Sequence, residues 1–331
     1  MSGSEAPGQR SPSSSVSVPW LTDSMAALKA AQAAGRMPHA LLIQAAEGSG
    51  GSLLANWCAQ LVLCTSAAPP CGQCQGCRRA AEERHPDLLL VRPLEDSQQI
   101  RIEQVRELGA ELALSSHQGG YKVAIIEPAD TLNRFAANSL LKTLEEPPPR
   151  TLLVLVAAQP SRLPATLTSR CQRVRVRAPA RAQSLDWLQS VRGSGDWDAV
   201  LDVIGEAPFA AATLDPTAVR NLRTDVVRTV EEIRGGLADP VTAAERWSRS
   251  ELPLRLACLE NWLTECIRQS LAGSAGAAEV RAGAHQRGAD FVMNTPALFG
   301  LLDRVRELKA ALPTPINRSL ALESLLRSVR T

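Results

Sequence analysis

The sequence predicts an α/β protein in which a parallel sheet covered by helices is followed by a region that is helical throughout. Two observations support this fold class. The stretch from Lys122 to Cys171 contains a β-branched run, a helical repeat and a second apolar run, which is the strand, helix, strand order of a βαβ unit. From about Pro216 onward, the apolar residues recur at helical spacing.

The βαβ unit can be read element by element. The run from Lys122 to Glu127 has the length of a strand, and the residues from Leu132 to Glu146 carry apolar side chains at helical spacing, Phe135 among them. The prolines at 147–149 end this helix because proline clashes with the preceding turn and lacks an N–H. The run from Leu152 to Val156 has no polar alternation, which is typical of a strand buried on both faces.

The same unit carries two motifs, SLLKTLEEPP at 139–148 and Ser169-Arg170-Cys171. Together they resemble the clamp-loader branch of the AAA+ ATPases, the machines that open DNA sliding clamps. The resemblance implies an AAA+ type sheet domain over residues 19–178, a small helical lid over 179–215 and an all-α collar over 216–331. Residues 1–18, rich in Ser, Pro and Gly, are predicted to form a disordered tail.

Other elements of the sheet domain follow from apolar runs and helix signals. In chain order they are a helix from Thr22 or Asp23, either of which can cap it, to about Ala34, a strand over 39–44, a helix over 53–63, a strand over 88–91 and a helix over 102–114.

The charge balance bounds the functional class. Lysine plus arginine number 36 and aspartate plus glutamate 34, so the formal net charge is 36 − 34 = +2. Near-neutrality argues against a protein whose only partner is DNA. No apolar stretch approaches the ~20 residues of a membrane span, and the N-terminus shows no secretory signal, so we expect a cytoplasmic protein with no membrane partner. None of the histidines 39, 85, 117 and 285 lies in a context that would activate a nucleophile, so no hydrolase is predicted.

The loop after the first strand reads Ala45-Ala46-Glu47-Gly48-Ser49-Gly50-Gly51-Ser52. A phosphate loop of the form GxxxxGK[ST] needs a lysine for the β and γ phosphates and a hydroxyl for Mg²⁺. Gly50 and Ser52 match this form, but Ala45 replaces the first glycine and Gly51 replaces the lysine. Glu47 adds negative charge, which opposes phosphate binding. The loop is therefore predicted not to bind ATP tightly.

Other ATPase features of the resembled family are altered as well. Glu127-Pro128 stands where these ATPases show Asp-Glu, and Ala157-Ala158 stands where they keep a polar γ-phosphate sensor. In the lid, Gly205 and Pro208 fall at a short Gly-containing motif, but the arginine expected three residues after the glycine is absent. The resemblance thus implies a member without its own ATP hydrolysis.

Arg170 is the residue with the greatest functional consequence. In the resembled family, the arginine of the Ser-Arg-Cys motif projects into the ATP site of the adjacent subunit as an arginine finger. A planar, permanently charged guanidinium can stabilise charge on a γ-phosphate in trans. The alternative is a solvated surface arginine.

A cysteine cluster follows the second helix, at Cys64, Cys71, Cys74 and Cys77. Cys-x-x-Cys spacing allows two thiolates to reach one Zn²⁺, and four cysteines complete a tetrahedron without an open position for catalysis. The pattern predicts a structural zinc module over 64–77. A disulfide or a redox pair fits less well in a cytoplasmic protein. His85 could replace Cys64 as the fourth ligand, but we favour a structural role for this histidine.

Outside this cluster, the remaining cysteines are predicted to be buried free thiols, namely Cys58, Cys171, Cys258 and Cys266. Arg173, Arg175 and Arg177 alternate with valines, which predicts a strand with one basic face. That face is either simply solvated or a contact for DNA phosphates.

The lid and collar are predicted as helices. Lid helices are expected over 182–191, 197–204 and 209–214. In the collar, leucine stripes over 252–267 and 298–312, and a last helix capped by Asn317, indicate either an ordinary bundle core or a surface that holds ring subunits together. Residues 273–288 are predicted to form a loop.

Taken with these features, the resemblance implies a clamp-loader subunit that does not hydrolyse ATP, with structural zinc and no bound ATP. The resemblance implies a heteropentameric ring with gamma or tau and delta subunits, which loads a sliding clamp onto primer-template DNA as part of a DNA-directed DNA polymerase holoenzyme. Two alternatives are an active gamma-type ATPase subunit and a zinc-ribbon protein that binds nucleic acid without a ring.

Overall fold

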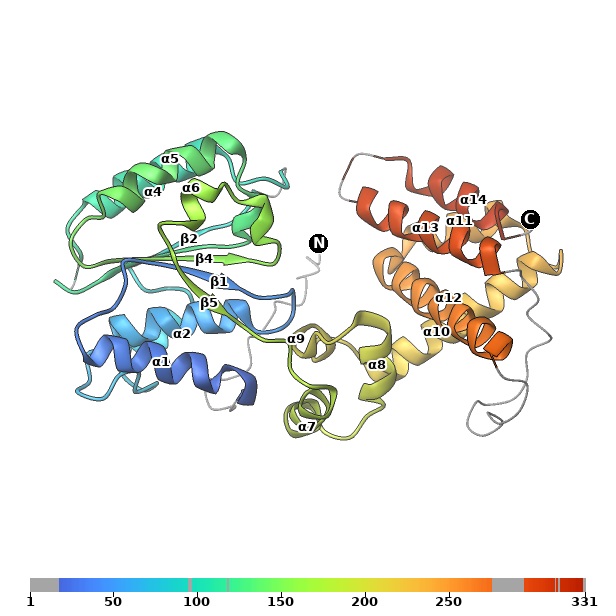
Figure 1. The fold of residues 1–331 in the computed structure, drawn as a ribbon, viewed down its shortest axis with the longest axis horizontal. Coiled ribbons are helices and arrows are strands. Elements are labelled where there is room, and N and C mark those ends of the chain that lie inside the picture. Colours follow the sequence, from blue (N-terminus) through green and yellow to red (C-terminus); the bar gives the residue numbers. More distant parts are fainter. Residues whose placement is uncertain are drawn as a thin grey trace, which may run out of the picture. The chain divides into compact units, whose positions relative to one another are not determined.

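The computed structural model describes residues 18–94, 97–117, 119–275, 295–312, 314 and 316–329, which form two compact units (Figure 1). The first unit contains the described residues up to Ser194 together with Glu206–Thr213, and the second contains Gly195–Gly205 and the described residues from Leu214 onward. The predicted lid is thus shared between the units, and the three-part division stays a prediction. The predicted tail lies outside the described residues except for Val18, which is 5% exposed in the core of the first unit.

A five-stranded sheet organises the first unit. Its order is β2-β3-β4-β1-β5, and every pairing is parallel, as predicted. The strands are β1 (Ala40–Gln44), β2 (Leu88–Val91), β3 (Lys122–Ile126), β4 (Thr151–Ala157) and β5 (Gln172–Arg175).

The central strands contribute side chains to cores on both faces of the sheet. In β4, Leu152 and Val154 enter one buried cluster, whereas Leu153 and Leu155 enter the other. Every residue of β3 and β4 is buried. This two-sided burial explains why the sequence shows no polar alternation in these strands.

Helices cover both faces (Figure 1). α1 (Thr22–Ala33) and α2 (Gly51–Leu63) lie on one face, while α4 (Ile102–Ala113) and α5 (Arg134–Glu145) lie on the other. The shorter elements of this unit are η1 (Pro19–Leu21), α3 (Gln75–Ala81), η2 (Ala129–Thr131), η3 (Pro160–Arg162), α6 (Ala165–Thr168), α7 (Arg181–Arg192) and α9 (Pro208–Ala211).

Two local predictions were wrong. α1 is preceded by Leu21 without a side-chain cap, so neither Thr22 nor Asp23 caps it. α5 begins at Arg134, where the Asn133 side chain accepts a hydrogen bond from the Ala136 N–H. This start places Phe135 in the first turn, where it is 69% exposed instead of facing the core.

The second unit is helical in its described residues. Its elements are α8 (Trp197–Ile204), α10 (Pro216–Arg234), α11 (Pro240–Arg249), α12 (Leu252–Ala275), α13 (Thr295–Ala311) and α14 (Arg318–Arg327). The predicted leucine stripes are largely buried, and Asn317 caps α14 through the Leu320 N–H, as expected. The loop prediction from 276 to 288 lies outside the described residues, and α12 continues to Ala275.

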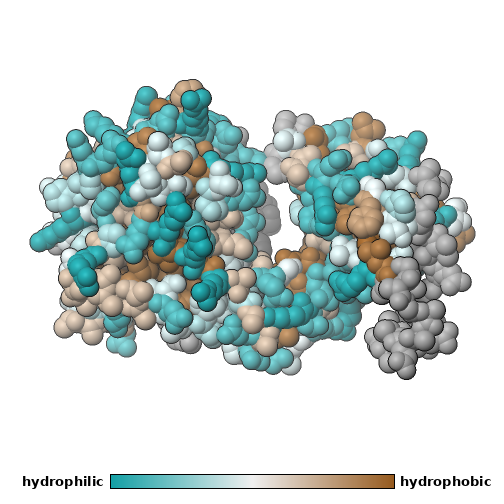
Figure 2. Space-filling view, in the orientation of Figure 1, coloured by the Kyte–Doolittle hydropathy of each residue, from teal (hydrophilic) through white to brown (hydrophobic). Residues whose placement is uncertain are grey.

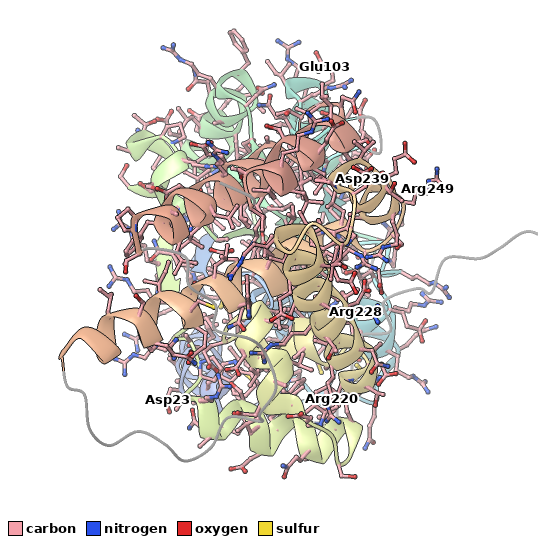
Figure 3. All side chains as sticks on the ribbon, turned by 90° about the vertical axis from the view of Figure 1, so that its right-hand side faces the viewer. Asp23, Glu103, Arg220, Arg228, Asp239 and Arg249 are labelled. Atoms are coloured by element: carbon pink, nitrogen blue, oxygen red, sulfur yellow. The ribbon has the colours of Figure 1, made fainter. Side chains whose placement is uncertain are left out.

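An ion-pair network centred on Asp225 joins three helices of this unit. Asp225 accepts from Arg255 Nη1 at 2.7 Å and from Arg228 Nη2 at 3.0 Å, while Arg246 Nη2 lies at 3.7 Å. Figure 3 shows Arg228 on α10, with Asp239 and Arg249 at the two ends of α11. The network ties α10 to α11 and α12.

Hydrophilic residues are spread over the face of the molecule in Figure 2 and are interrupted by small apolar areas. The large exposed apolar residues come from different elements: Leu94, Leu114, Phe135, Leu237, Leu271, Phe299 and Leu320. No helix among the described residues is long and apolar enough to span a bilayer.

Candidate functional site

The loop between β1 and α2 occupies the position of the predicted phosphate loop, and it is tightly packed. Gly48 has φ of +70°, and a Cβ there would lie 2.9 Å from the Cβ atoms of Ala207 and Ala210. A Cβ on Gly51 would lie 2.7 Å from the Cβ of Ala45. A lysine at position 51 would therefore require this turn to move.

Segments of the same unit cover this loop. The Trp20 indole Nε1 donates to the Ser49 carbonyl at 2.7 Å, and the Phe209 N–H donates to the Gly48 carbonyl at 3.0 Å. The rings of Trp20, Trp187 and Phe209 pack against one another with centroids 4.7 to 6.0 Å apart. The loop is thus held by groups from η1 and α9, and Trp187 of α7 packs against both of these aromatic residues.

Two residues at predicted ATPase positions also contact each other: Ser52, at the position of the Mg²⁺-binding hydroxyl, and Glu127, at the first position of the altered acidic pair. The Ser52 hydroxyl, in the first turn of α2, donates a hydrogen bond to Oε1 of Glu127, which follows β3 directly. Ala157 is buried, and its carbonyl accepts from the Ala45 N–H at 3.1 Å. Pro128 follows Glu127, and its carbonyl accepts from the Thr131 hydroxyl at 2.6 Å. The Ser52 hydroxyl and the Glu127 carboxylate are therefore hydrogen-bonded to each other.

Arg170 lies just after α6, and its side chain is 37% exposed. Its Nη2 lies 2.6 Å from Glu145 Oε1, and its Nη1 donates to the Thr166 carbonyl at 2.7 Å. The neighbouring motif residues have different roles: Ser169 Oγ donates to the Thr166 carbonyl at 3.1 Å, and Cys171 is buried. The motif therefore anchors the turn on both sides of a surface guanidinium.

The four cysteines of the predicted zinc module come together, with all sulfur atoms within 4.8 Å of one another. Cys71 Sγ and Cys77 Sγ are 4.0 Å apart, and Cys74 Sγ and Cys64 Sγ are 3.8 Å apart. Thiolates ~2.3 Å from a tetrahedral Zn²⁺ lie ~3.8 Å from one another. The sulfur positions therefore fit a single tetrahedral ion.

Backbone groups prepare this cluster for a cation. The N–H of Cys77 donates to Cys74 Sγ at 3.3 Å and lowers the pKa of that thiol to about 6. The N–H of Cys74 lies 3.3 Å from Cys71 Sγ and lowers its pKa as well, whereas burial raises the pKa of Cys77 to about 12. Gly76 lies against the Leu63 carbonyl, which a Cβ would approach to 2.4 Å, so α3 packs closely on the end of α2.

His85 is outside the cysteine group. It is 3% exposed, its Nδ1 accepts from the Asp87 N–H at 3.1 Å, and burial lowers its pKa. Asp87, 1% exposed, accepts from the His117 N–H at 2.8 Å. His85 and Asp87 thus connect the start of β2 to the loop before β3.

The other cysteines are distributed through the cores. Burial raises the pKa of Cys58 to about 12 and those of Cys171, Cys258 and Cys266 to about 11. Cys266 is half-buried, so its predicted full burial was wrong. Arg173 and Arg175 are exposed on β5, with Val174 half-buried between them, and Arg177 is exposed beyond the strand.

Sequence reasoning missed two sets of residues. It did not identify Glu145 as the partner of Arg170, although Glu145 lies within the SLLKTLEEPP motif. It also missed the contacts of Trp20 and Phe209 with the loop and the packing of Trp187 against these two rings. Only the presence of aromatic residues in a chain that is 3% aromatic could have drawn attention to them.

Comparison with known proteins identifies the family. A family model described as "DNA polymerase III, delta subunit" matches residues 21–180. A protein named DNA polymerase III subunit delta' from Pseudomonas aeruginosa is 36% identical over 239 residues, which is 70% of this chain and 73% of that protein. This chain belongs to the DNA polymerase III delta' subunit family. A second delta' subunit, from Escherichia coli, is 33% identical over 79% of this chain and 78% of its own length.

Members of related families are also similar. The DNA polymerase III subunit tau of Escherichia coli is 32% identical over 61% of this chain and 30% of its own length. The fold resembles that of a DNA polymerase III gamma subunit-related protein from Thermotoga maritima, with a TM-score of 0.50, 18% identity, and coverage of 92% of this chain and 98% of that one. The resemblance to clamp-loader proteins predicted from the motifs is therefore confirmed by the delta' relatives. The solved structure supports the predicted fold of this chain.

Proposed function

We propose that this chain is a clamp-loader subunit that does not hydrolyse ATP itself and that contributes Arg170 to the ATP site of a neighbouring subunit. The observation that supports this proposal best is the pairing of two features in one unit. The phosphate loop lacks its lysine and is covered by Trp20 and Phe209, while Arg170 is held at the surface of the same unit. A subunit can therefore lack its own chemistry and still serve that of its neighbour.

The proposed assembly is a heteropentameric ring with gamma or tau and delta subunits, which loads the sliding clamp onto primer-template DNA in the cytoplasm. The division into a sheet domain over 19–178, a lid over 179–215 and a collar over 216–331 belongs to this proposal. In it, the helices from α10 to α14 hold the ring together. The chain itself would carry out no step of the polymerase reaction.

Structural zinc belongs to the same proposal. Cys64, Cys71, Cys74 and Cys77 would hold the ion, and the sulfur separations of 3.8 and 4.0 Å support this ligand set. Bound Zn²⁺ would supply positive charge that keeps the thiols deprotonated. Four sulfur ligands leave no position for a water molecule, so the ion would hold α3 against the end of α2 and take no part in catalysis.

The first test measures ATP binding to the isolated chain by equilibrium dialysis with labelled ATP. We expect no saturable binding. Binding in the micromolar range would instead identify an active gamma-type ATPase. Tight DNA binding by the isolated chain, with a steep salt dependence, would identify a nucleic-acid-binding zinc protein.

The second test compares the wild-type chain with Arg170→Ala in a complex reconstituted with gamma and delta subunits, clamp and primed DNA. Loss of an arginine finger lowers hydrolysis at one site by ~10³-fold or more. The total ATPase activity of the complex should therefore fall by at least the fraction of the activity that this one site contributes. Arg162→Ala, an exposed arginine in η3, is the matched control and should leave the rate unchanged. Equal rates for the wild type and Arg170→Ala would contradict the trans role.

A further inference from the structure

Two acceptors from different elements hold the Arg170 guanidinium. The Thr166 carbonyl, on α6, accepts from Nη1 at 2.7 Å. The Glu145 carboxylate, at the end of α5, lies 2.6 Å from Nη2. The Thr166 acceptor is a backbone carbonyl, which any residue at that position would supply. The Glu145 acceptor is a side-chain carboxylate, which depends on the residue type at position 145.

The location of Glu145 is electrostatically unfavourable by itself. It is the last residue of α5, and Glu146 follows it directly. The C-terminus of a helix carries partial negative charge, so a carboxylate there is destabilising unless a cation offsets it. Lys142 also lies in the last turn of α5, but Arg170 pairs with Glu145 directly at 2.6 Å, which indicates that Glu145 is placed for this contact.

The contact leaves the guanidinium able to bind another anion. A guanidinium has five N–H donors, and the contacts with Glu145 and Thr166 engage two of them. Within the described part of the chain, three donors stay available, and the side chain is 37% exposed. The arginine is thus both oriented and accessible.

We propose that Glu145 is a positioning residue for the trans action of Arg170, an inference that rests on the proposed function. Glu145 and Thr166 together fix the plane of the guanidinium before a neighbouring subunit docks. An unrestrained arginine would lose rotamer freedom each time it reached a γ-phosphate. Orientation in advance removes part of that cost from the transition state.

The experiment compares wild type, Glu145→Ala, Arg170→Ala and the double variant in the reconstituted complex with clamp and primed DNA, using pre-steady-state ATP hydrolysis. An exposed ion pair has a modest coupling energy, so Glu145→Ala should slow hydrolysis at the affected site by about two- to fivefold. The change should appear in kcat and not in KM for ATP, because it acts on the transition state. In the Arg170→Ala background, Glu145→Ala should have no further effect.

Glu146→Gln is the matched control, because it removes a neighbouring charge from the same helix end and makes no ion pair with Arg170 in the described structure. It should hydrolyse ATP at the wild-type rate. Thermal unfolding and co-elution with the other subunits should be the same for all variants.

Each of the other outcomes is decisive. A wild-type or increased rate for Glu145→Ala, while Arg170→Ala is impaired, would overturn the positioning role and leave the proposed function in place. Equal further loss from Glu145→Ala in the Arg170→Ala background would show a structural effect and overturn it too. A wild-type rate for Arg170→Ala itself would overturn both proposals.

Discussion

The backbone N–H of Phe209 donates to the carbonyl of Gly48 at 3.0 Å. This contact joins α9 to the loop between β1 and α2, although the two residues are far apart in the sequence. At this contact Gly48 has a left-handed φ, and the side chains of Ala207 and Ala210 lie close to the position that a Cβ of residue 48 would occupy. Glycine at position 48 therefore serves the packing of α9 on the loop.

Gly48→Ala should destabilise the first unit strongly. An alanine at φ of +70° is strained by ~1–2 kcal/mol, and its Cβ would also clash at 2.9 Å with two alanine side chains, which adds ~1–3 kcal/mol. Urea unfolding measures the sum. Gly35→Ala is the control, since Gly35 has φ of +66° but nothing within 4 Å of its Cβ position. Equal losses for both variants would show that the approach of α9 contributes nothing.

Removal of zinc should destabilise the region around α3. We expect one Zn²⁺ per purified chain by elemental analysis, and little in Cys71→Ser, because three thiolates and a hydroxyl bind zinc more weakly than four thiolates. Unfolding of the variant should begin at a temperature lower by several degrees, since binding free energy is also folding free energy.

Cys266→Ser is the control for this measurement, because Cys266 lies on α12, outside the cysteine cluster. It should retain the full zinc content. A chain that contains no zinc after purification without chelators, or a Cys71→Ser variant that keeps it, would rule out the four-cysteine ligand set.

Stability should depend on the ionisation of Asp225. Burial alone would raise the pKa of this carboxyl, but the hydrogen bonds from Arg255 and Arg228 and the charge of Arg246 outweigh burial and hold the pKa below its usual range. The carboxylate therefore contributes stability that is complete above its unfolded pKa of ~3.9 and is lost as the pH falls through the lower folded value.

Asp225→Asn should thus cost ~1–3 kcal/mol at pH 7, because Arg255, whose side chain is only 9% exposed, loses its charged partner. The difference from wild type should shrink as the pH falls below ~4. Urea unfolding from pH 7 to pH 3 checks this, with Glu265→Gln as the control, since its pair with Arg268 is exposed and worth less than ~1 kcal/mol. A difference that is constant with pH would show that packing and not charge is responsible.

Asp87 should be needed for the stability of the sheet edge. Asp87→Ala removes a carboxylate that is 1% exposed and accepts from the His117 N–H at 2.8 Å, and a hydrogen bond to a charged group contributes ~1.5–3 kcal/mol. Chemical denaturation measures this loss. Asp186→Ala, at an exposed position of α7, should change stability by less than ~0.5 kcal/mol.

The order of the elements could be predicted from the sequence because the strands are buried on both faces. Runs such as Leu152 to Val156 have no polar residue and so mark central strands of a parallel sheet. Helix boundaries were less accurate. Periodicity alone placed the start of α5 at Leu132, whereas the cap at Asn133 sets its actual start at Arg134.

The cysteine cluster could be predicted as a group because its spacing is local. Contacts between distant segments could not be predicted, because they depend on how the elements pack. Neither the hydrogen bond between Ser52 and Glu127 nor the ion pair between Glu145 and Arg170 leaves a periodic signal in the sequence. Motif residues were recognised, but their partners were found only in the structure.

The edge strand β5 has a consequence for the association of one copy of the chain with another. It pairs only with β1 in the described structure, so one side of its backbone is open to another strand. Such an edge invites intermolecular strand pairing unless it is short or charged. β5 has four residues, and Arg173 and Arg175 project from it into solvent. A second copy of the chain would have to bring like charges together to extend the sheet, so Arg173 and Arg175 oppose strand pairing between copies.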